Sequence, residues 1–266
     1  MTATTAWRAD PYGDALRTGR GPLFLRRDDG WLLPLEVERW CGAPDRADRS
    51  VLDRCLGTVL DVGCGPGRLV AALGDRALGV DVSPEAVART ERLGATALCR
   101  SVFDPLPGEG RWDTALLIDG NIGIGGDPAA LLRRMRQVVA GSGRVIAECV
   151  PLDVDERCEV RVDDGRGGRG APFPWARTGV RALSAHAAAT GWTVAERWDL
   201  WGRHFVALTG RSSSGSAEGA PATAVRGSSP PPPRPPPRGR SPGSVRTAAA
   251  ARRGSAAPPA GPAAAA

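Results

Sequence analysis

Apolar runs alternate with amphipathic segments through the middle of the chain. One run of apolar or β-branched residues is interrupted by a single acidic residue and consists of Thr58, Val59, Leu60 and Val62. This run predicts a strand that is buried on both faces of a parallel sheet. Further strands are predicted over 77–82, 95–102, 112–119 and 144–150. The helices predicted between them cover 68–74, 84–94 and a segment from Asp127-Pro128 to Gly141-Ser142-Gly143. This alternation predicts a parallel sheet between helices.

The C-terminal part of this pattern predicts a helix over 178–190 and then an antiparallel hairpin. The hairpin strands are 192–200 and 203–208, and they turn at Trp201-Gly202. Residues 151–179 break the alternation, because one strand over 159–162 and a glycine-rich loop over 164–170 lead into a segment with two prolines.

An aromatic segment precedes the first sheet strand. It contains a short helix from Asp10, a hairpin that turns at Asp29-Gly30, and two more short helices over 36–40 and 50–56. Its aromatic side chains are Trp7, Tyr12, Phe24, Trp31 and Trp40. Two interpretations remain open: a packing layer, or a lid over residues 7–33 in which Tyr12 is a polar contact.

Composition separates the last 56 residues from the rest. From Arg211 onward the chain has 12 of its 24 prolines and no tryptophan, phenylalanine or tyrosine, so we expect a disordered tail over 211–266. The tail has eight arginines against Glu218 alone, which leaves residues 1–210 with a net charge of −1 although the whole chain carries +6. A near-neutral body gives no electrostatic reason to expect a nucleic-acid partner. The expected divisions are 1–56, 57–210 and 211–266.

The cysteines and histidines do not predict a metal site. The six cysteines form no Cys-x-x-Cys pair, and His186 and His204 are the only histidines. Residues 1–30 contain no apolar run typical of a signal peptide, and no stretch has the length of a membrane span. We therefore expect a cytoplasmic protein without a membrane partner. The sequence does not indicate an oligomeric state.

A glycine turn follows the first sheet strand. Gly63, Gly65 and Gly67 remove side chains where a strand passes into a helix, which is typical of a nucleotide site and would let a ligand approach the backbone N–H groups. A plain strand-to-helix turn is the alternative. The dinucleotide fingerprint requires glycine where this chain has Arg68, which disfavours NAD and FAD.

The segment Asp61-Val62-Gly63-Cys64-Gly65-Pro66-Gly67 resembles the first motif of class I S-adenosylmethionine (SAM)-dependent methyltransferases, and Leu78-Gly79-Val80-Asp81 resembles the second. The resemblance implies SAM as cofactor and a Rossmann-like, doubly wound, mostly parallel α/β sheet in three layers with an antiparallel terminal hairpin. It also implies that Asp81 holds the ribose hydroxyls. The cofactor-binding residues that we expect are Asp61, Gly63, Cys64, Gly65, Gly67, Asp81, Val82 and Asp119, with Val102, Phe103 or Asp104 at the adenine.

Asp119 stands at the end of a predicted strand and before a loop with four glycines, where open α/β sheets place their ligands. We expect it, together with Tyr12, at the catalytic site; a turn or helix-capping carboxylate is the alternative. The loop lacks the Asn/Asp-Pro-Pro-aromatic signature of enzymes that methylate exocyclic base amines. The sequence thus predicts methyl transfer to a small molecule, with acceptor recognition by the N-terminal segment and residues 151–179. The alternatives are a SAM-binding scaffold without catalysis and, less favoured, an NAD-dependent oxidoreductase.

Overall fold

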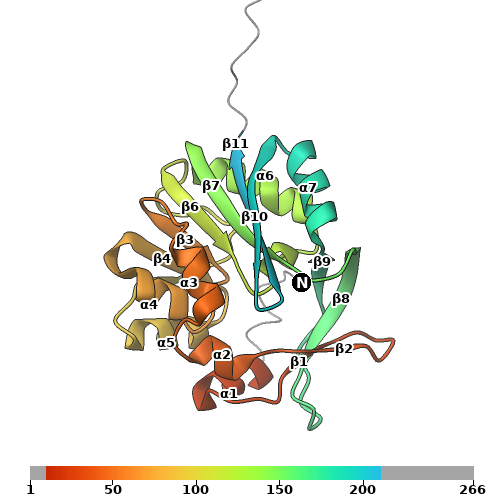
Figure 1. The fold of residues 1–266 in the computed structure, drawn as a ribbon. Helices are drawn as coiled ribbons and strands as arrows, with labels where there is room; N and C mark the ends of the chain where they lie inside the picture. The colour runs from red at the N-terminus through yellow and green to blue at the C-terminus, as the bar shows by residue number, and fades with distance from the viewer. Residues whose placement is uncertain (1–9, 211–266) are drawn as a thin grey trace, which may run out of the picture. The chain divides into compact units, whose positions relative to one another are not determined.

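A seven-stranded sheet forms the centre of the protein (Figure 1). The structure is a computed structural model and describes residues 10–210, so Trp7 and the tail predicted over 211–266 lie outside the described residues. Five strands run parallel, and the last two form an antiparallel hairpin at one edge, which confirms the predicted fold class. In spatial order the strands are β10 (Trp192–Leu200), β11 (Arg203–Gly210), β7 (Val139–Cys149), β6 (Trp112–Leu117), β3 (Val59–Val62), β4 (Ala77–Asp81) and β5 (Ala97–Cys99).

Helices cover both faces of this sheet and make three layers (Figure 1). One face packs against α3 (Arg46–Leu52), α4 (Arg68–Leu73) and α5 (Pro84–Arg92), and the other against α6 (Pro128–Val138) and α7 (Val180–Ala189). Ser83 and Asp127 cap α5 and α6 as predicted, since each side chain accepts a hydrogen bond from the first turn and a proline occupies the first helical position.

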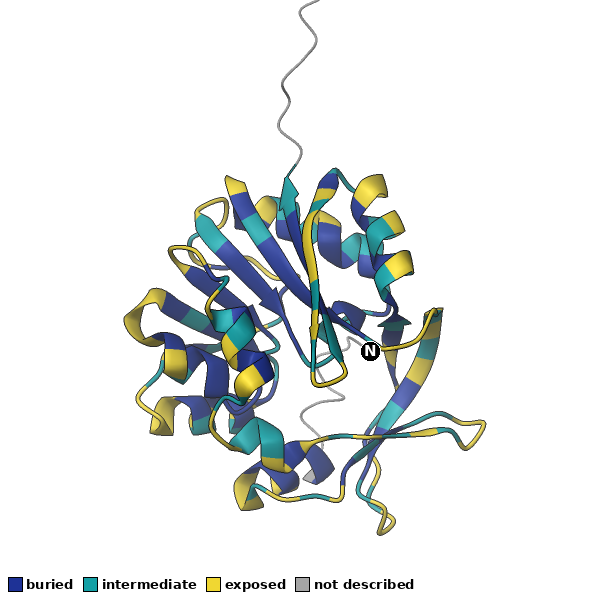
Figure 2. Ribbon diagram, in the orientation of Figure 1, coloured by how far each residue is buried: buried dark blue, intermediate teal, exposed yellow. Residues whose placement is uncertain are grey.

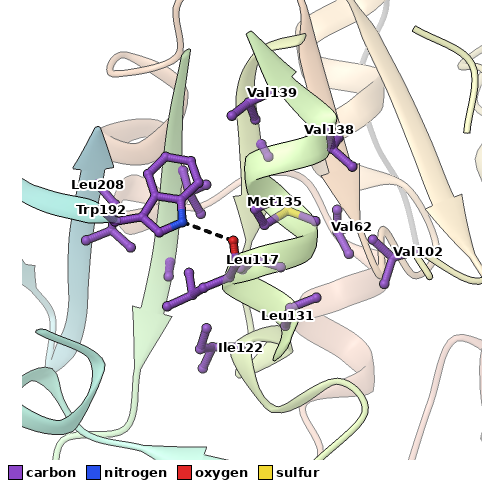
Figure 3. Close-up of a cluster of buried hydrophobic side chains, with 14 of the residues drawn as sticks. Val62, Val102, Leu117, Ile122, Leu131, Met135, Val138, Val139, Trp192 and Leu208 are labelled. Carbon is purple, nitrogen blue, oxygen red and sulfur yellow. Dashed lines mark hydrogen bonds between the residues drawn. The ribbon is translucent and has the colours of Figure 1, made fainter. Parts of the chain in front are cut away.

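The core between the sheet and α6 is built around Trp192. Its indole N–H donates to the carbonyl oxygen of Leu132 at 3.0 Å, which satisfies the only polar atom of a fully buried side chain (Figure 3). Met135 and Leu131 continue the same face of α6 towards Val62 and the loop after β5. The central strands are buried along almost their whole length (Figure 2), which explains why their sequences do not alternate between apolar and polar residues.

A second, four-stranded sheet is built from two distant parts of the sequence. Its order is β2 (Leu32–Pro34), β1 (Phe24–Arg26), β8 (Asp155–Asp163) and β9 (Phe173–Thr178), and all neighbours are antiparallel. The N-terminal hairpin turns near Asp29-Gly30 as predicted. It pairs with residues 161–163 of β8, within the segment 151–179 that departs from the alternation of strands and helices. Helices α1 (Asp10–Thr18) and α2 (Val37–Cys41) flank this sheet (Figure 1).

Several element boundaries differ from the predicted ones. Helix α3 lies four residues earlier than expected, because Asp45 and Asp48 form a reciprocal capping box at its start. Strand β7 begins at Val139, so the Gly141-Ser142-Gly143 segment is part of the strand instead of a helix stop. Strand β5 is only three residues long, and residues 173–178 form a strand in place of the expected irregular segment.

In the range 10–210, none of the helices is long and apolar enough to cross a membrane. All six cysteines are free thiols there; Cys55, Cys64 and Cys149 are buried, and Cys99 is exposed.

Candidate functional site

A pocket lies at the carboxyl ends of the parallel strands, where the chain changes direction across the sheet. From β3 the chain proceeds outward to β4 and β5 and then returns to the opposite side of β3 as β6, which is the point at which open α/β sheets bind their ligands. The space between protein atoms in the pocket is about 1260 Å³, a volume that includes open solvent at its mouth. Its sheet side is lined by Val62, Gly63, Val80, Asp81, Val82, residues 100–103 and 119–122, Ile124, Gly125 and Val150.

The small sheet and its flanking helices provide the opposite wall. The lining residues from this side are Tyr12, Leu25, Leu33, Leu35, Trp40 and residues 173–178. The N-terminal segment and residues 151–179, which the sequence analysis named separately as acceptor-recognition regions, therefore reach the same pocket.

The glycine turn after β3 uses its amide N–H groups inside the chain. Gly63 and Cys64 both donate to the carbonyl oxygen of Val80, at 2.8 and 3.1 Å, and Gly65 donates to Asp81 Oδ2 at 2.9 Å. Gly67 donates to the carbonyl oxygen of Cys64 at 3.1 Å. The expectation that these N–H groups are open to a ligand is thus wrong. The glycines leave space because they have no side chains, and the backbone N–H groups of the turn bind the end of β4 instead of a ligand.

Gly63 is the glycine of the turn that lines the pocket. Its φ of +69° favours glycine, and a Cβ atom there would lie 2.7 Å from Asn121 Nδ2. Asn121, in the short 3-10 helix η3 (Asn121–Gly123), donates from that nitrogen to the carbonyl oxygens of Val62 and Gly63, at 2.9 and 2.8 Å. Glycine at this position therefore allows Asn121 to fasten the loop after β6 to the end of β3.

We expect Gly63→Ala to weaken binding of S-adenosylhomocysteine by about tenfold or more, because the new methyl group displaces Asn121 from the pocket wall. Gly74→Ala is a matched control, since Gly74 has a similar φ of +62° but a Cβ there would meet no atom within 4 Å, and Gly74 does not line the pocket. Titration calorimetry on both variants separates steric displacement from backbone strain. Equal losses in the two variants would contradict the role given to Asn121.

Asp81 ends β4 on the pocket wall. Its Oδ2 accepts from Gly65 N–H at 2.9 Å and its Oδ1 from Ser83 N–H at 2.8 Å, so the carboxylate is fixed in direction by two backbone groups. A carboxylate has about four lone-pair sites, and two stay available for a ligand. Burial raises the pKa of Asp81, and the hydrogen bonds from Ser83 and Gly65 oppose that rise.

The loop after β5 supplies a flat apolar part of the pocket. Val102 is buried and Phe103 is partly exposed, and both line the pocket together with Val82. Asp104 does not line it, so of the three residues predicted at the adenine only Val102 and Phe103 lie at the pocket; the adenine contact itself stays a prediction. Phe103 itself packs where a Cβ of Gly125 would stand, 2.8 Å from its ring.

Arg134 holds this loop in place. Arg134, in α6, is largely buried and donates to the carbonyl oxygens of Val102 and Asp104, both at 2.8 Å, and to Glu109. A long side chain with five donors can bridge a helix and a loop whose carbonyl groups have no strand partner.

Asp119 lies at the pocket wall, and its carboxylate is shared by three arginines. It is 2.7 Å from Arg39 Nη2, 2.8 Å from Arg68 Nη1 and 3.2 Å from Arg203 Nη2. Its φ of +59° is unusual for a residue other than glycine, and its own N–H donates to Glu148 Oε2 at 2.8 Å. These arginines lower the pKa of Asp119 although burial alone would raise it.

The three arginines belong to a larger buried ionic cluster, which we define as Arg39, Arg68, Arg203, Asp48, Asp119 and Glu148. Arg68 and Arg203 both donate to Asp48, and Arg203 donates to both oxygens of Glu148 at 2.8 Å. Through these contacts α2, α3, α4, β7 and the terminal hairpin meet beside the pocket.

Four predicted cofactor residues stand behind the pocket wall. Asp61, Cys64, Gly65 and Gly67 do not line it. Asp61 is buried within β3, and desolvation raises its pKa to about 7 although Arg68 opposes the shift. Cys64 packs against the backbone of Gly79, and Gly67 leaves room for Thr90, whose hydroxyl would be 2.3 Å from a Cβ there. Their structural role is to shape the turn; a direct contact with cofactor stays a prediction.

Tyr12, in α1, lines the pocket as predicted and is buried. Burial raises the pKa of its hydroxyl well above the usual value, and the charge of Asp81 adds to that rise. Tyr12 is therefore a neutral phenol at physiological pH, which can donate a proton in a hydrogen bond but is not a base.

Sequence reasoning did not identify Asn121, Trp40, Trp175, Arg177 and Thr178 as pocket residues. Asn121 lies in the loop whose position was predicted, so its place at the end of a strand was an available signal. The other four come from segments whose pairing is not encoded in any local pattern.

The pocket fits a nucleoside. It combines a fixed carboxylate at Asp81 that could accept from two hydroxyl groups, apolar residues Val82, Val102 and Phe103 that could pack on a planar base, and Gly63, where a side chain would occupy the pocket. Within residues 10–210 there is no group of three or more histidine, cysteine or acidic side chains that could hold a metal ion.

Residues 59–143 match a family model described as a methyltransferase domain. No curated protein sequence matches the chain significantly. Among solved structures, a SAM-dependent methyltransferase from Bacteroides fragilis, in complex with S-adenosyl-L-homocysteine, is 22% identical and has a TM-score of 0.65. The match covers 79% of this chain and 97% of that chain, so it includes the fold beyond the matched domain.

Two further structures are similar at lower levels. A 1,6-didemethyltoxoflavin-N1-methyltransferase from Burkholderia thailandensis is 19% identical with a TM-score of 0.46, over 62% of this chain and 75% of that one. A sugar N-methyltransferase from a Streptoalloteichus species is 19% identical with a TM-score of 0.48, over 66% and 90%.

Proposed function

We propose that this chain, a class I SAM-dependent methyltransferase, transfers the methyl group to a small-molecule acceptor held in the covered pocket. The observation that carries the proposal is the composition of the pocket wall. One side consists of the strand ends that fit the donor, and the other consists of the small sheet, α1 and α2. A site enclosed on two sides by mostly apolar residues suits a small molecule better than a nucleic-acid strand, which needs a basic, open groove.

The donor side divides into three roles. Asp81 accepts from the ribose hydroxyls, Val82, Val102 and Phe103 enclose the adenine, and Gly63 leaves room beside the turn. SAM supplies an electrophilic methyl group: the acceptor's lone pair forms the new bond to the methyl carbon while the carbon–sulfur bond breaks and its electron pair stays on sulfur.

The two predicted catalytic residues are poorly suited to remove a proton from the acceptor. Asp119 has a lowered pKa and three arginine partners, and Tyr12 remains protonated. We therefore propose that Asp119 positions the loop after β6 and that Tyr12 contacts bound ligand as a donor. The protein then accelerates transfer mainly by aligning donor and acceptor and excluding water, which suits an in-line displacement.

We propose that the N-terminal segment forms a wall of the acceptor site that is already folded before ligand binds. Leu16, Leu23 and Leu25 are buried, and β1 is paired on both sides, with β2 and with β8. This packing favours a wall that is formed before ligand binds over a lid that closes afterwards. Hydrogen exchange distinguishes the two: slow exchange over residues 23–26 without ligand supports the wall, and protection only after SAM is added supports the lid.

The proposed function is tested by binding and turnover on the full chain. We expect S-adenosylhomocysteine to bind in titration calorimetry and NADH not to bind. Incubation with methyl-labelled SAM and a fractionated metabolite extract should then transfer label to a compound of low mass. Donor binding without transfer to any fraction would favour the scaffold alternative, and binding of NADH alone would favour the oxidoreductase.

A further inference from the structure

The pocket contains few groups that could take a proton from an acceptor. Among the residues 10–210 that line it, the carboxylates are Asp81 and Asp119, the phenol is Tyr12, and there is no histidine, cysteine or glutamate. The sequence has two histidines, His186 and His204, and neither lines this pocket. Outside residues 10–210 the sequence adds one carboxylate, Glu218, and no histidine, cysteine, tyrosine or lysine side chain.

The three candidate bases are already engaged. Asp81 accepts from the N–H groups of Gly65 and Ser83, and the proposed function assigns its other lone pairs to the ribose. Asp119 is paired with three arginines, which lower its pKa and make it a weaker base. Tyr12 stays protonated, because burial and the charge of Asp81 raise its pKa. An acceptor in this pocket must therefore be nucleophilic without giving up a proton to the protein first.

This requirement separates the common kinds of acceptor. Near pH 7, an aliphatic amine with a pKa of about 10.4 has a free lone pair in fewer than about one molecule in a thousand, and a phenol with a pKa of about 10 is ionised to a similar extent. Each loses about a thousandfold in rate unless a base takes its proton. A nitrogen atom conjugated with an aromatic ring is uncharged near pH 7, so its lone pair is free.

An ammonium group would also lack a partner here. The charged residues that line the pocket, within 10–210, are Asp81, Asp119, Arg100 and Arg177. The two carboxylates are engaged as described, and the two arginines would repel a cation. The sulfonium of SAM adds a further positive charge, so a cationic acceptor is disfavoured and an uncharged one is accepted.

The surface that the covering side presents is apolar. Leu33, Leu35, Trp40 and Ile124 line the pocket and are partly exposed, so their side chains are accessible to a ligand. Such a wall suits an aromatic ring, which gains contact area without a polar partner.

Building on the proposed function, we propose that the methyl acceptor is an uncharged aromatic molecule and that the methyl group goes to a nitrogen atom conjugated with its ring. The nitrogen lone pair forms the bond to the methyl carbon, while the carbon–sulfur bond breaks and its electron pair stays on sulfur. The positive charge passes from sulfur to nitrogen. Where that nitrogen carries a hydrogen, the proton goes to water after the transfer.

Three matched probes test the acceptor class on the full chain with methyl-labelled SAM: 4-propylaniline, 4-propylphenol and 4-propylbenzylamine. They share a ring and a propyl group and differ in the nucleophile. Near pH 7 the aniline should be methylated at least about tenfold faster than either of the others. A smaller preference, or a faster phenol or benzylamine, overturns the proposal.

The dependence of the rate on pH shows whether the protein supplies a base. From about pH 6 to about pH 8.5 the rate with the aniline should stay level, and the rate with the phenol should rise about tenfold per pH unit, because it follows the ionisation of the phenol itself. A phenol rate that is already level at about pH 6 would show a base in the protein and overturn the proposal.

A pair of variants on β2 locates the probe by binding alone. In the presence of S-adenosylhomocysteine, ligand-observed NMR should show that Leu33→Asn weakens binding of 4-propylaniline by about threefold or more, because a polar group replaces part of the apolar wall. Leu32→Asn is the control, since Leu32 is exposed and does not line the pocket, and it should change affinity by less than about twofold. Equal effects of the two variants would contradict binding at this wall.

Binding of S-adenosylhomocysteine is measured in parallel on the wild type and both variants. If it binds to the wild type and none of the three probes is methylated, the acceptor class is wrong and the donor site stands. If it does not bind to the wild type, the proposed function fails first.

Discussion

Replacing Asp81 by alanine should weaken binding of S-adenosylhomocysteine by roughly ten- to a hundredfold. The carboxylate is fixed by the N–H groups of Gly65 and Ser83, and it faces the pocket with lone pairs to spare for two ribose hydroxyls. A charged acceptor in a buried position contributes about 1.5–3 kcal/mol per hydrogen bond, and alanine also leaves the Gly65 N–H without its acceptor. Titration calorimetry on the purified chain measures the loss.

Asp75→Ala provides the matched control for this measurement. Asp75 is exposed and precedes the same strand at its other end, so its removal should change affinity by less than about twofold. Circular dichroism shows whether the Asp81 variant keeps its fold. If a folded Asp81→Ala protein binds within about twofold of the wild type, Asp81 does not hold the ribose.

Replacing Asp48 by alanine should lower the free energy of unfolding by about 3–5 kcal/mol. Asp48 is fully buried and accepts from Arg68 Nε and Nη2, at 2.8 and 2.9 Å, and from Arg203 Nη1 at 2.8 Å. Its removal leaves two guanidinium groups with one carboxylate fewer in a place from which water is largely excluded. Urea denaturation followed by tryptophan fluorescence measures the change.

Asp28→Ala is the corresponding surface control. Asp28 pairs with Arg161 at 3.5 Å but its side chain is exposed, so the expected cost is at most about 1 kcal/mol. The double variant Asp48→Ala/Arg68→Met should recover part of the loss, because it removes the buried charge together with its partner. A loss of less than about 1 kcal/mol for Asp48→Ala alone would contradict the importance of the ionic cluster.

The same carboxylate should make stability depend on pH. The hydrogen bonds and charges of Arg68 and Arg203 lower the pKa of Asp48 although burial opposes them. Its contribution is therefore present above the ordinary aspartate pKa of about 3.9 and is lost as pH falls below that value. The difference in unfolding free energy between wild type and Asp48→Asn should shrink as pH is lowered through this range, and a constant difference would contradict the lowered pKa.

Local sequence signals predicted the parallel part of the sheet and the side of the pocket that its strand ends form. Each of these signals depends on a local requirement for a residue type. The buried strand Val59–Val62 requires apolar residues, the turn after it requires glycines because its backbone is left-handed, and β4 ends in the polar residue Asp81. Ser83 and Asp127 likewise predicted the starts of two helices, as capping residues. The terminal hairpin followed from its composition and its Trp201-Gly202 turn.

Only the tertiary structure decided how the covering side of the pocket is formed. The pairing of Leu25 with Val162 joins residues more than a hundred positions apart, and no nearby residue specifies such a contact. The same holds for Arg203, which meets Asp48 from the far end of the described chain. Asp119 shows how far local sequence could go. Its position at a strand end was predictable from the sequence. Its three arginine partners, which lower its pKa, come from helices and a hairpin that only folding brings together. Sequence thus determined the elements and the glycine turn, because these depend on local backbone and burial preferences. The covering wall of the pocket and the charge state of its side chains were decided by long-range packing, because electrostatic environment and strand pairing are properties of the assembled fold.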